Sequence, residues 1–138
     1  MSTEDSKALV CRCYEELNKG NLAGIDEVFA TDVVVHAPGG QEAHGLEKGK
    51  QLFAKLWRAF PDHYETVDDM VAEGDKVVAR VTWTGTQQGE FQGMAPTGKQ
   101  VTLKAITINR VVDGKIVEVW EEADILDMMQ QLGAIPSP

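Results

Sequence analysis

Basic side chains are scarce in this sequence. The chain of 138 residues has 13 lysines and arginines against 22 aspartates and glutamates, and its formal net charge at pH 7 is −9. Nucleic acids and anionic membranes are bound through clusters of Lys and Arg, and none occurs here. No apolar run is long enough to span a membrane, and the N-terminal MSTEDSK lacks the hydrophobic segment of a signal peptide. We therefore expect no nucleic-acid or membrane partner and a cytoplasmic location.

Cysteine is also rare, and the motifs of several enzyme classes are missing. The two cysteines, Cys11 and Cys13, are two positions apart in a predicted helix, so they face different sides and are poorly placed for a disulfide. No His-x-x-x-His or His-x-Glu spacing occurs. P-loop, G-x-G-x-x-G and nucleophile-elbow motifs are absent as well. We expect no metal site, no phosphate-binding loop and no hydrolase-type serine.

Size and composition fit a single globular domain, residues 1–138, with 43% apolar and 25% charged residues. Apolar residues recur with helical spacing as far as Phe60, and from His63 onward they alternate as in strands. The predicted order is three helices (3–19, 22–29 and 46–60) with a short strand at 33–36, four strands (63–72, 77–83, 101–112 and 115–124) and a helix at 125–132. This order predicts an α+β fold in which a strongly curved, mostly antiparallel sheet wraps around the N-terminal helices, as a cone with one open end.

The strongest local signal is a hairpin at Asp113-Gly114, because both central residues of a type I′ turn need positive φ. A two-residue loop sets Val112 opposite Lys115, and an unbroken register then follows along both strands. Glu121 falls on the face predicted to be a packing or interface surface. The other face mixes acids, an amide and a hydroxyl with apolar residues, which is typical of a pocket wall. That face carries Leu103, Ala105, Thr107, Asn109 and Val111 against Asp124, Glu122, Trp120, Glu118 and Ile116.

Asp124 is the first candidate for chemistry in this predicted pocket. A carboxyl group between apolar side chains and near other carboxylates has a raised pKa, which suits a general base or acid near neutral pH. Asp124 also precedes the C-terminal helix, so it can simply cap that helix, and both roles can hold at once. Glu118 and Glu122 are either further acids of the pocket or partners of Arg110, Lys104 or water.

His36 follows three valines and either reaches the interior, as a proton carrier or hydrogen-bond donor, or is satisfied locally at the strand end. His44 and His63 are weaker candidates. The segment Gly85–Gly98, GTQQGEFQGMAPTG, is a long loop, and such loops in compact domains are usually functional or flexible. A further set of large side chains either lines an apolar cavity or belongs to the core. These are Tyr14, Phe53, Trp57, Phe60, Trp83, Met94 and Trp120.

A series of short motifs covers nearly the whole chain. In order they are His36-Ala37-Pro38-Gly39, Ala59-Phe60-Pro61-Asp62, Glu73-Gly74-Asp75-Lys76-Val77, Gly89-Glu90-Phe91, Pro96-Thr97-Gly98-Lys99, Arg110, Asp113-Gly114-Lys115-Ile116-Val117-Glu118, Trp120, Asp124 and Gln131-Leu132-Gly133. Together they resemble the SnoaL-like polyketide cyclases, or ester cyclases, of the NTF2-like superfamily. The resemblance implies a cone with a deep pocket between sheet and helices, and a homodimer or higher homo-oligomer formed through the outer face of the sheet.

Characterised members of this family close the last ring of an aromatic polyketide ester by intramolecular aldol condensation, without metal, cofactor or covalent intermediate. The resemblance therefore implies a hydrophobic carbonyl compound as substrate and no cofactor. A single aspartate acts as base and then as acid, and the family's Trp-x-x-x-Asp pattern places this role on Asp124. The cyclases carry a histidine and a glutamine on the preceding strand, where the same face here offers Asn109 and Thr107. Val119 stands where a histidine often precedes the tryptophan.

Three functions fit this sequence. The first is a cyclase, isomerase or lyase in which Asp124 abstracts a proton next to a carbonyl, while Glu122, His36, Asn109 and Thr107 orient the substrate. On this hypothesis, Asp124→Asn keeps the fold and abolishes turnover. The alternatives are a non-catalytic carrier or sensor of a hydrophobic small molecule, and a dimeric scaffold with a vestigial pocket.

Overall fold

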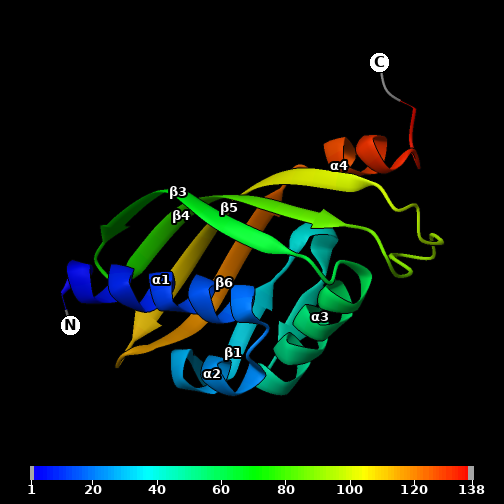
Figure 1. Cartoon of the computed structure of the whole chain (residues 1–138). Coiled ribbons are helices and arrows are strands. Elements are labelled where there is room, and N and C mark those ends of the chain that lie inside the picture. The colour runs from blue at the N-terminus through cyan, green and yellow to red at the C-terminus, as the bar shows by residue number, and fades with distance from the viewer. Residues whose placement is uncertain (1, 137–138) are drawn as a thin grey trace.

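The computed structural model describes residues 2–136 as four α-helices, one 3-10 turn and six strands (Figure 1). Along the chain they are α1 (Thr3–Lys19), α2 (Leu22–Val28), β1 (Phe29–His36), η1 (Pro38–Gly40), β2 (Glu42–His44), α3 (Leu46–Ala59), β3 (Tyr64–Glu73), β4 (Lys76–Thr86), β5 (Gln100–Val112), β6 (Lys115–Ala123) and α4 (Ile125–Leu132). The predicted α+β class and the predicted order of helices and long strands are confirmed. The short elements η1 and β2 have no clear signal in the hydrophobic pattern.

The strands form one curved sheet in the order β2-β1-β6-β5-β4-β3. Neighbouring strands are antiparallel except β1 and β6, which run parallel. The alternation along β4 is regular: Val77, Ala79, Val81 and Trp83 are buried, and the residues between them are more exposed. Such alternation is expected of an antiparallel strand with one face packed on the core.

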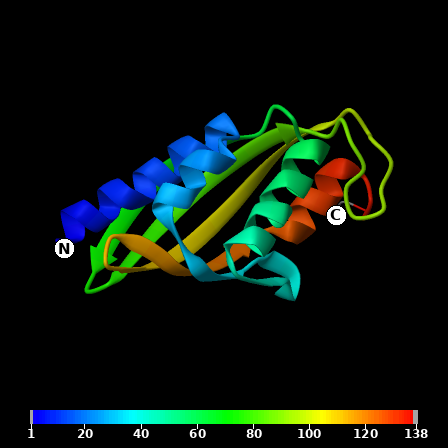
Figure 2. The same ribbon diagram turned by 90° about the horizontal axis from the view of Figure 1, so that it is seen from below.

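Helices α1, α2 and α3 lie on the same side of the sheet, as the two perpendicular views show (Figures 1 and 2). Helix α1 starts at a capping box formed by Ser2 and Asp5 and ends at Gly20, which adopts the left-handed conformation. Val10, Ile25 and Val28 point from α1 and α2 into the main core and are completely buried. Helix α4 lies instead against β5, where the Gln131 side chain pairs with the backbone of Thr102 at both N–H and C=O.

The β5–β6 hairpin closes as predicted, but its register changes two residues beyond the turn. Asp113 and Gly114 both have positive φ, at 50° and 74°, and Val112 pairs with Lys115. Val111 then pairs with Ile116, whereas Arg110 pairs with Glu118, so Val117 is an extra residue, a β-bulge in β6. Because side chains alternate along a strand, one extra residue moves every later side chain of β6 to the opposite face.

The face predicted for the second half of β6 is therefore wrong. Thr107 pairs with Glu121 and Asn109 with Val119, so these residues share the inner face of the sheet. Trp120 and Glu122 pair with the outward-facing residues Ile108 and Ile106. The half of the prediction that concerned β5 holds, since Ala105, Thr107 and Asn109 are all buried on the inner side.

Candidate active site

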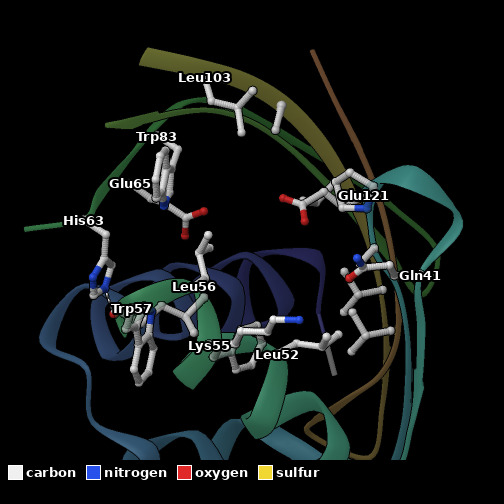
Figure 3. A pocket seen from close by; sticks show the side chains of 18 of the residues that line it. Gln41, Leu52, Lys55, Leu56, Trp57, His63, Glu65, Trp83, Leu103 and Glu121 are labelled. Carbon is white, nitrogen blue, oxygen red and sulfur yellow. Dashed lines mark hydrogen bonds between the residues drawn. The ribbon is translucent and has the colours of Figure 1, made fainter. Parts of the chain in front are cut away.

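A cavity of about 220 Å³ lies between the inner face of the sheet and helices α1 and α3 (Figure 3). One water molecule needs only ~10–15 Å³ on a comparable measure, so the cavity is large enough for an organic ligand. Apolar side chains dominate its wall. The lining residues include Leu17, Phe29, Val35, Leu52, Phe53, Leu56, Trp57, Trp83, Phe91, Leu103, Ala105, Val119, Ile125 and Met128.

Two carboxyl groups, those of Glu65 and Glu121, lie in this apolar cavity. Glu65 comes from β3 and Glu121 from β6, and Figure 3 shows the two side chains pointing toward each other from opposite walls. Within residues 2–136, neither carboxyl group has a hydrogen-bond donor or a cation as partner. Burial raises the pKa of Glu121 to about 7. Burial and the negative charge of Glu121 raise the pKa of Glu65 to about 8.

Local backbone structure fixes both acids in place. The Asn18 side chain on α1 donates to the carbonyl oxygen of Glu65 at 2.9 Å and accepts from its N–H at 2.7 Å. This double contact ties the start of β3 to the first helix, so Glu65 does not depend on strand pairing alone for its position. Glu121 faces the cavity because the bulge at Val117 precedes it.

A buried polar network lies beside Glu121. The Tyr14 hydroxyl and Thr107 Oγ1 are 2.8 Å apart, and Asn109 Nδ2 donates to Thr107 Oγ1 at 3.1 Å and to the Val77 carbonyl at 3.4 Å. Burial raises the pKa of the Tyr14 phenol, which therefore stays protonated and keeps its O–H donor. Since Thr107 is the cross-strand partner of Glu121, the network borders the carboxyl group.

The opposite wall is aromatic. Phe53 and Trp57 on α3 are stacked, and Trp57 stacks in turn on His63, with ring centroids 6.2 Å and 5.2 Å apart. The His63 Nε2 donates to the Leu17 carbonyl at 2.8 Å, and its Nδ1 is buried without a hydrogen-bond partner among the described residues. This wall is flat and apolar, which suits a planar conjugated ring system.

The loop between β4 and β5 contributes Glu90, Phe91 and Gln92 to the cavity. Its centre is Gln87, which is completely buried. The Gln87 side chain donates to the carbonyls of Gly89, Met94 and Ala95 and accepts from the N–H and hydroxyl of Thr97. The loop predicted at Gly85–Gly98 therefore exists, from 87 to 99, and its fold is set by one buried amide.

Eight of the side chains predicted to line a pocket do so: Tyr14, Phe53, Trp57, Trp83, Leu103, Ala105, Thr107 and Asn109. Phe60 is fully buried in the neighbouring core, where it contacts Trp83 and Phe91 edge to face. Met94 packs against that same core cluster. Neither Phe60 nor Met94 lines the cavity, since both pack in this second core cluster.

His36, Glu118 and Trp120 come together on the outer face of the sheet, outside this cavity. His36 lies between two carboxylates, with Nε2 2.7 Å from Glu118 and Nδ1 2.7 Å from Glu42, and its ring stacks on Trp120. Glu118 also accepts from Arg110 at 3.1 Å. The hydrogen bonds to Glu118 and then Glu42 raise the pKa of His36. The predicted face of Glu118, Trp120 and Glu122 is wrong, because the bulge in β6 turns them to the other side. For Glu118 and His36 the structure shows the alternative that the sequence left open: Glu118 pairs with Arg110, and His36 finds its partners at the end of β1.

Asp124 is the N-cap of α4. Its side chain is exposed and accepts from the N–H of Asp127 at 3.1 Å. It does not line the cavity. The structure thus shows the capping arrangement that the sequence left open, and it does not place Asp124 on the predicted pocket face.

Sequence reasoning missed Glu65 and assigned Glu121 to the wrong face. Glu65 lies in the polar stretch 64–69, which is typical of a solvent-exposed strand. Only the alternation of inward and outward residues along the strand could have indicated that Glu65 points inward.

In the described part of the chain, no group of three or more His, Cys, Asp or Glu side chains is placed to hold a metal ion. No helix between residues 2 and 136 is long and apolar enough to cross a membrane.

Comparisons with known proteins agree with this architecture. The family model described as SnoaL-like polyketide cyclase matches residues 8–132. Aklanonic acid methyl ester cyclase DnrD of Streptomyces peucetius is 30% identical over 131 residues, which are 91% of this chain and 88% of that protein. Nogalonic acid methyl ester cyclase of Streptomyces nogalater is 29% identical over 121 residues, 84% of this chain and 88% of that protein. The structure of AclR from Streptomyces galilaeus has a TM-score of 0.88 at 33% identity, covering 99% of this chain and 86% of that one.

Proposed function

Because this chain belongs to the SnoaL-like polyketide cyclase family, we propose that it is an enzyme that closes a carbon ring by acid and base catalysis without a cofactor. Related chemistry on the same site, of isomerase or lyase type, needs the same first proton transfer. The names of the relatives suggest a methyl ester of an aromatic polyketide acid as substrate. One observation carries the proposal: Glu121, whose carboxyl group has no hydrogen-bond or ion-pair partner among residues 2–136, lies in an apolar cavity and has a pKa near neutrality.

The chemistry follows from that carboxyl group. The Glu121 carboxylate takes a proton from the carbon next to a carbonyl, and the resulting enolate carbon attacks a second carbonyl of the same molecule. A carbon–carbon bond forms, and the oxygen of the attacked carbonyl takes up a proton to become a hydroxyl. A base whose pKa lies near the working pH is well matched to this task. The apolar wall excludes water and holds the two reacting carbons close together.

We assign the base to Glu121 in place of Asp124. Glu121 lines the cavity and lies beside Tyr14 and Thr107, whereas Asp124 is exposed and holds the N-terminus of α4. A general base must reach the proton that it removes, so position decides between the two acids.

The test compares Glu121→Gln with Asp124→Asn, using aklanonic acid methyl ester as substrate and following ring closure by chromatography and mass spectrometry. Glu121→Gln is expected to lower kcat by ~10²–10⁴-fold, the usual contribution of general acid–base catalysis. Asp124→Asn is expected to leave kcat and thermal stability nearly unchanged, because Asn caps helices about as well as Asp. The reverse result, an inactive Asp124 variant and an active Glu121 variant, would restore Asp124 as the base.

A second candidate function is a non-catalytic binding protein. Its support is that the polar side chains beside Glu121 in the described part of the chain are Tyr14, Thr107 and Asn109, which offer no imidazole to relay a proton. They are hydrogen-bonded to one another and to the Val77 carbonyl. Calorimetric titration of the same ester at pH 5, 7 and 9 separates the two. If the affinity does not change with pH and the ester is recovered without ring closure, a protein that only binds the compound is favoured.

The outer face of the sheet supports a homodimer as part of the proposal. Tyr64, Val71, Ile106 and Val112 are 56%, 57%, 50% and 40% exposed, and a second copy of the chain could cover this apolar surface. The cysteines are free, with Cys11 exposed and Cys13 buried, and this fits the cytoplasmic location that we propose.

A further inference from the structure

We infer that Glu65 is a second catalytic residue of the cavity: it donates a proton to the carbonyl oxygen under attack while Glu121 removes the carbon-bound proton from the other side. The inference rests on the proposed function and assigns the acid of the reaction as well as the base. It follows from the placement, across one apolar space, of two carboxyl groups that have no partner in the described part of the chain.

The curvature of the sheet creates this placement. In the sheet, β3 and β6 are separated by β4 and β5. In a flat sheet, the side chains of Glu65 and Glu121 would therefore be far apart and would point in the same direction. Here the sheet bends around the helices, and the two carboxyl groups face each other across the cavity (Figure 3). A ligand between them is in reach of both.

Their surroundings assign one proton to the pair. Two carboxylates facing each other in an apolar site do not ionise independently, and the first charge opposes the second. The other titratable groups that line the cavity are Cys13, Tyr14, Lys55, His63 and Glu90. The Cys13 thiol and Tyr14 phenol are neutral because burial raises the pKa of each, and the exposed Lys55 approaches from α3. Position distinguishes the two members: Glu121 is the cross-strand partner of Thr107 and lies beside the hydrogen-bonded Tyr14 and Thr107, whereas Glu65 lies on the far wall. Polar groups favour the charged form, so we assign the carboxylate to Glu121 and the acid to Glu65, and the burial that raises the pKa of Glu65 agrees with this order.

This pair balances the reaction. Glu121 gains the proton of the broken C–H bond, the enolate carbon forms the new C–C bond, and Glu65 gives its proton to the oxygen that becomes a hydroxyl. The pair holds one proton before and after the step, on opposite members, and exchange with water restores the starting state. No oxidant, reductant or additional base is needed.

The pair also limits the substrate. An enolisable carbon must lie toward Glu121 on β6 and an electrophilic carbonyl toward Glu65 on β3, with the body of the molecule along the aromatic wall of Phe53 and Trp57. We therefore expect the substrates to be flat dicarbonyl compounds. The number of atoms between their two carbonyl groups must match the size of the ring that forms. Molecules with a single carbonyl would be enolised without being cyclised.

The test uses Glu65→Gln, which keeps the shape of the side chain but cannot give up a proton. Two rates are measured on aklanonic acid methyl ester in D₂O: deuterium entry at the carbon next to the carbonyl, and ring closure. Because Glu121 is intact, deuterium entry is expected to continue at close to the wild-type rate, while ring closure falls by ~10²-fold. Glu121→Gln is expected to lose both rates. Glu73→Gln, an exposed acid on the same strand, is the matched control and keeps both.

A second measurement does not depend on turnover. Carboxyl ¹³C NMR of the wild-type protein, labelled on glutamate, follows both titrations, and the two single variants assign them. The Glu65 pKa is expected to fall in Glu121→Gln, because the opposing charge has gone, and to stay above neutrality in the wild type.

The outcomes separate the two levels of the proposal. Full ring closure by Glu65→Gln together with an inactive Glu121→Gln would overturn the role of Glu65 and leave the cyclase proposal standing. Failure of the wild-type protein both to exchange and to close the ester would count against the proposed function for this ester. A Glu65 that is ionised at pH 7 in the NMR titration would overturn the inference in either case.

Discussion

A carboxyl group that faces apolar side chains without a hydrogen-bond donor is costly to ionise, and among residues 2–136 two such groups lie in one cavity. Glu65 and Glu121 have pKa values raised above the ordinary 4.5 of a glutamate, mainly through burial. Between that value and about pH 8 the folded protein therefore binds more protons than the unfolded chain. Under this condition the free energy of unfolding falls as pH rises, because ionisation is easier in the unfolded state.

Glu65→Gln is expected to remove part of this pH dependence. The stability of the wild type is highest below the unfolded pKa and is lost as pH rises through the folded values, whereas the amide stays neutral throughout. Relative to wild type, the variant should gain roughly 0.5–2 kcal/mol at pH 8 and little at pH 5, which is the usual scale of stabilisation when a functional group is removed. Urea denaturation at the two pH values measures the difference.

Glu73→Gln serves as the control, since its carboxyl group is exposed at the far end of the same strand. An equal gain for both variants, or none for Glu65→Gln, would mean that the Glu65 carboxylate is well solvated inside the cavity. Burial of the Glu65 carboxyl group would then not explain both the stabilisation by Glu65→Gln and the loss of ring closure in that variant.

Single residues also show the limits of sequence reasoning. Tyr14, Phe53 and Trp57 could be predicted as pocket residues, because a helix that packs on a curved sheet presents its aromatic face to the space between them. Glu65 could not, because the sequence around it is polar and is typical of an exposed edge strand. Its neighbours Tyr64 and Thr66 are indeed exposed.

At the scale of elements, the hairpin was predictable at its turn and unpredictable along its length. Asp113-Gly114 specify the turn through their positive φ values, and the observed pairing of Val112 with Lys115 follows. The bulge at Val117 has no comparable signal, because a bulge with ordinary side chains is set by packing across the sheet. The error then passed to Glu118, Trp120 and every later residue of β6.

The loop between β4 and β5 packs against the end of α3 at one small residue. Gly89 donates its N–H to the Ala59 carbonyl at 3.1 Å, and a Cβ at position 89 would lie 2.6 Å from the Arg58 carbonyl oxygen. Backbone cannot move aside as a side chain does, so the loop itself has to shift. The residues that follow, Glu90 and Phe91, line the cavity.

Gly89→Ala is therefore expected to disturb the cavity without unfolding the protein. The KM for the polyketide ester should rise by about tenfold, equivalent to ~1.4 kcal/mol of lost binding, while the mid-point of thermal unfolding moves little. Steady-state kinetics with a parallel thermal melt gives both values. The neighbouring Gln88→Ala is the control, because its side chain is exposed. An unchanged KM for Gly89→Ala would show that the loop does not contact the substrate.

At the scale of the whole molecule, the sheet has an inner face that forms the cavity and an outer face that helices α1, α2 and α3 leave uncovered (Figures 1 and 2). The outer face carries Ile106, which is half exposed, between charged and apolar neighbours. Burying such a face between two copies of the chain would remove apolar surface from water, which is the main source of free energy in association.

Ile106→Arg is expected to convert a dimer into a monomer, because two unpaired guanidinium groups would meet near the middle of the interface. Size-exclusion chromatography with light scattering measures the mass directly. Leu126→Arg provides the control, since Leu126 is 57% exposed but lies on α4, away from the sheet's outer face. A wild-type protein that elutes as a monomer at all concentrations would contradict the proposal.

The bulge at Val117 has a consequence for how this fold changes over time. Glu121, Glu122 and Asp124 stand within four positions of one another, and the bulge, together with the number of residues that follow it, decides which one faces the cavity. Deletion of a single residue between the bulge and Glu121, with the bulge kept, would set Glu122 opposite Thr107 and turn Glu121 to the outer face, without altering any other letter of the sequence. Two relatives of equal composition can thus carry their base at different aligned positions, and strand length is itself a heritable determinant of activity.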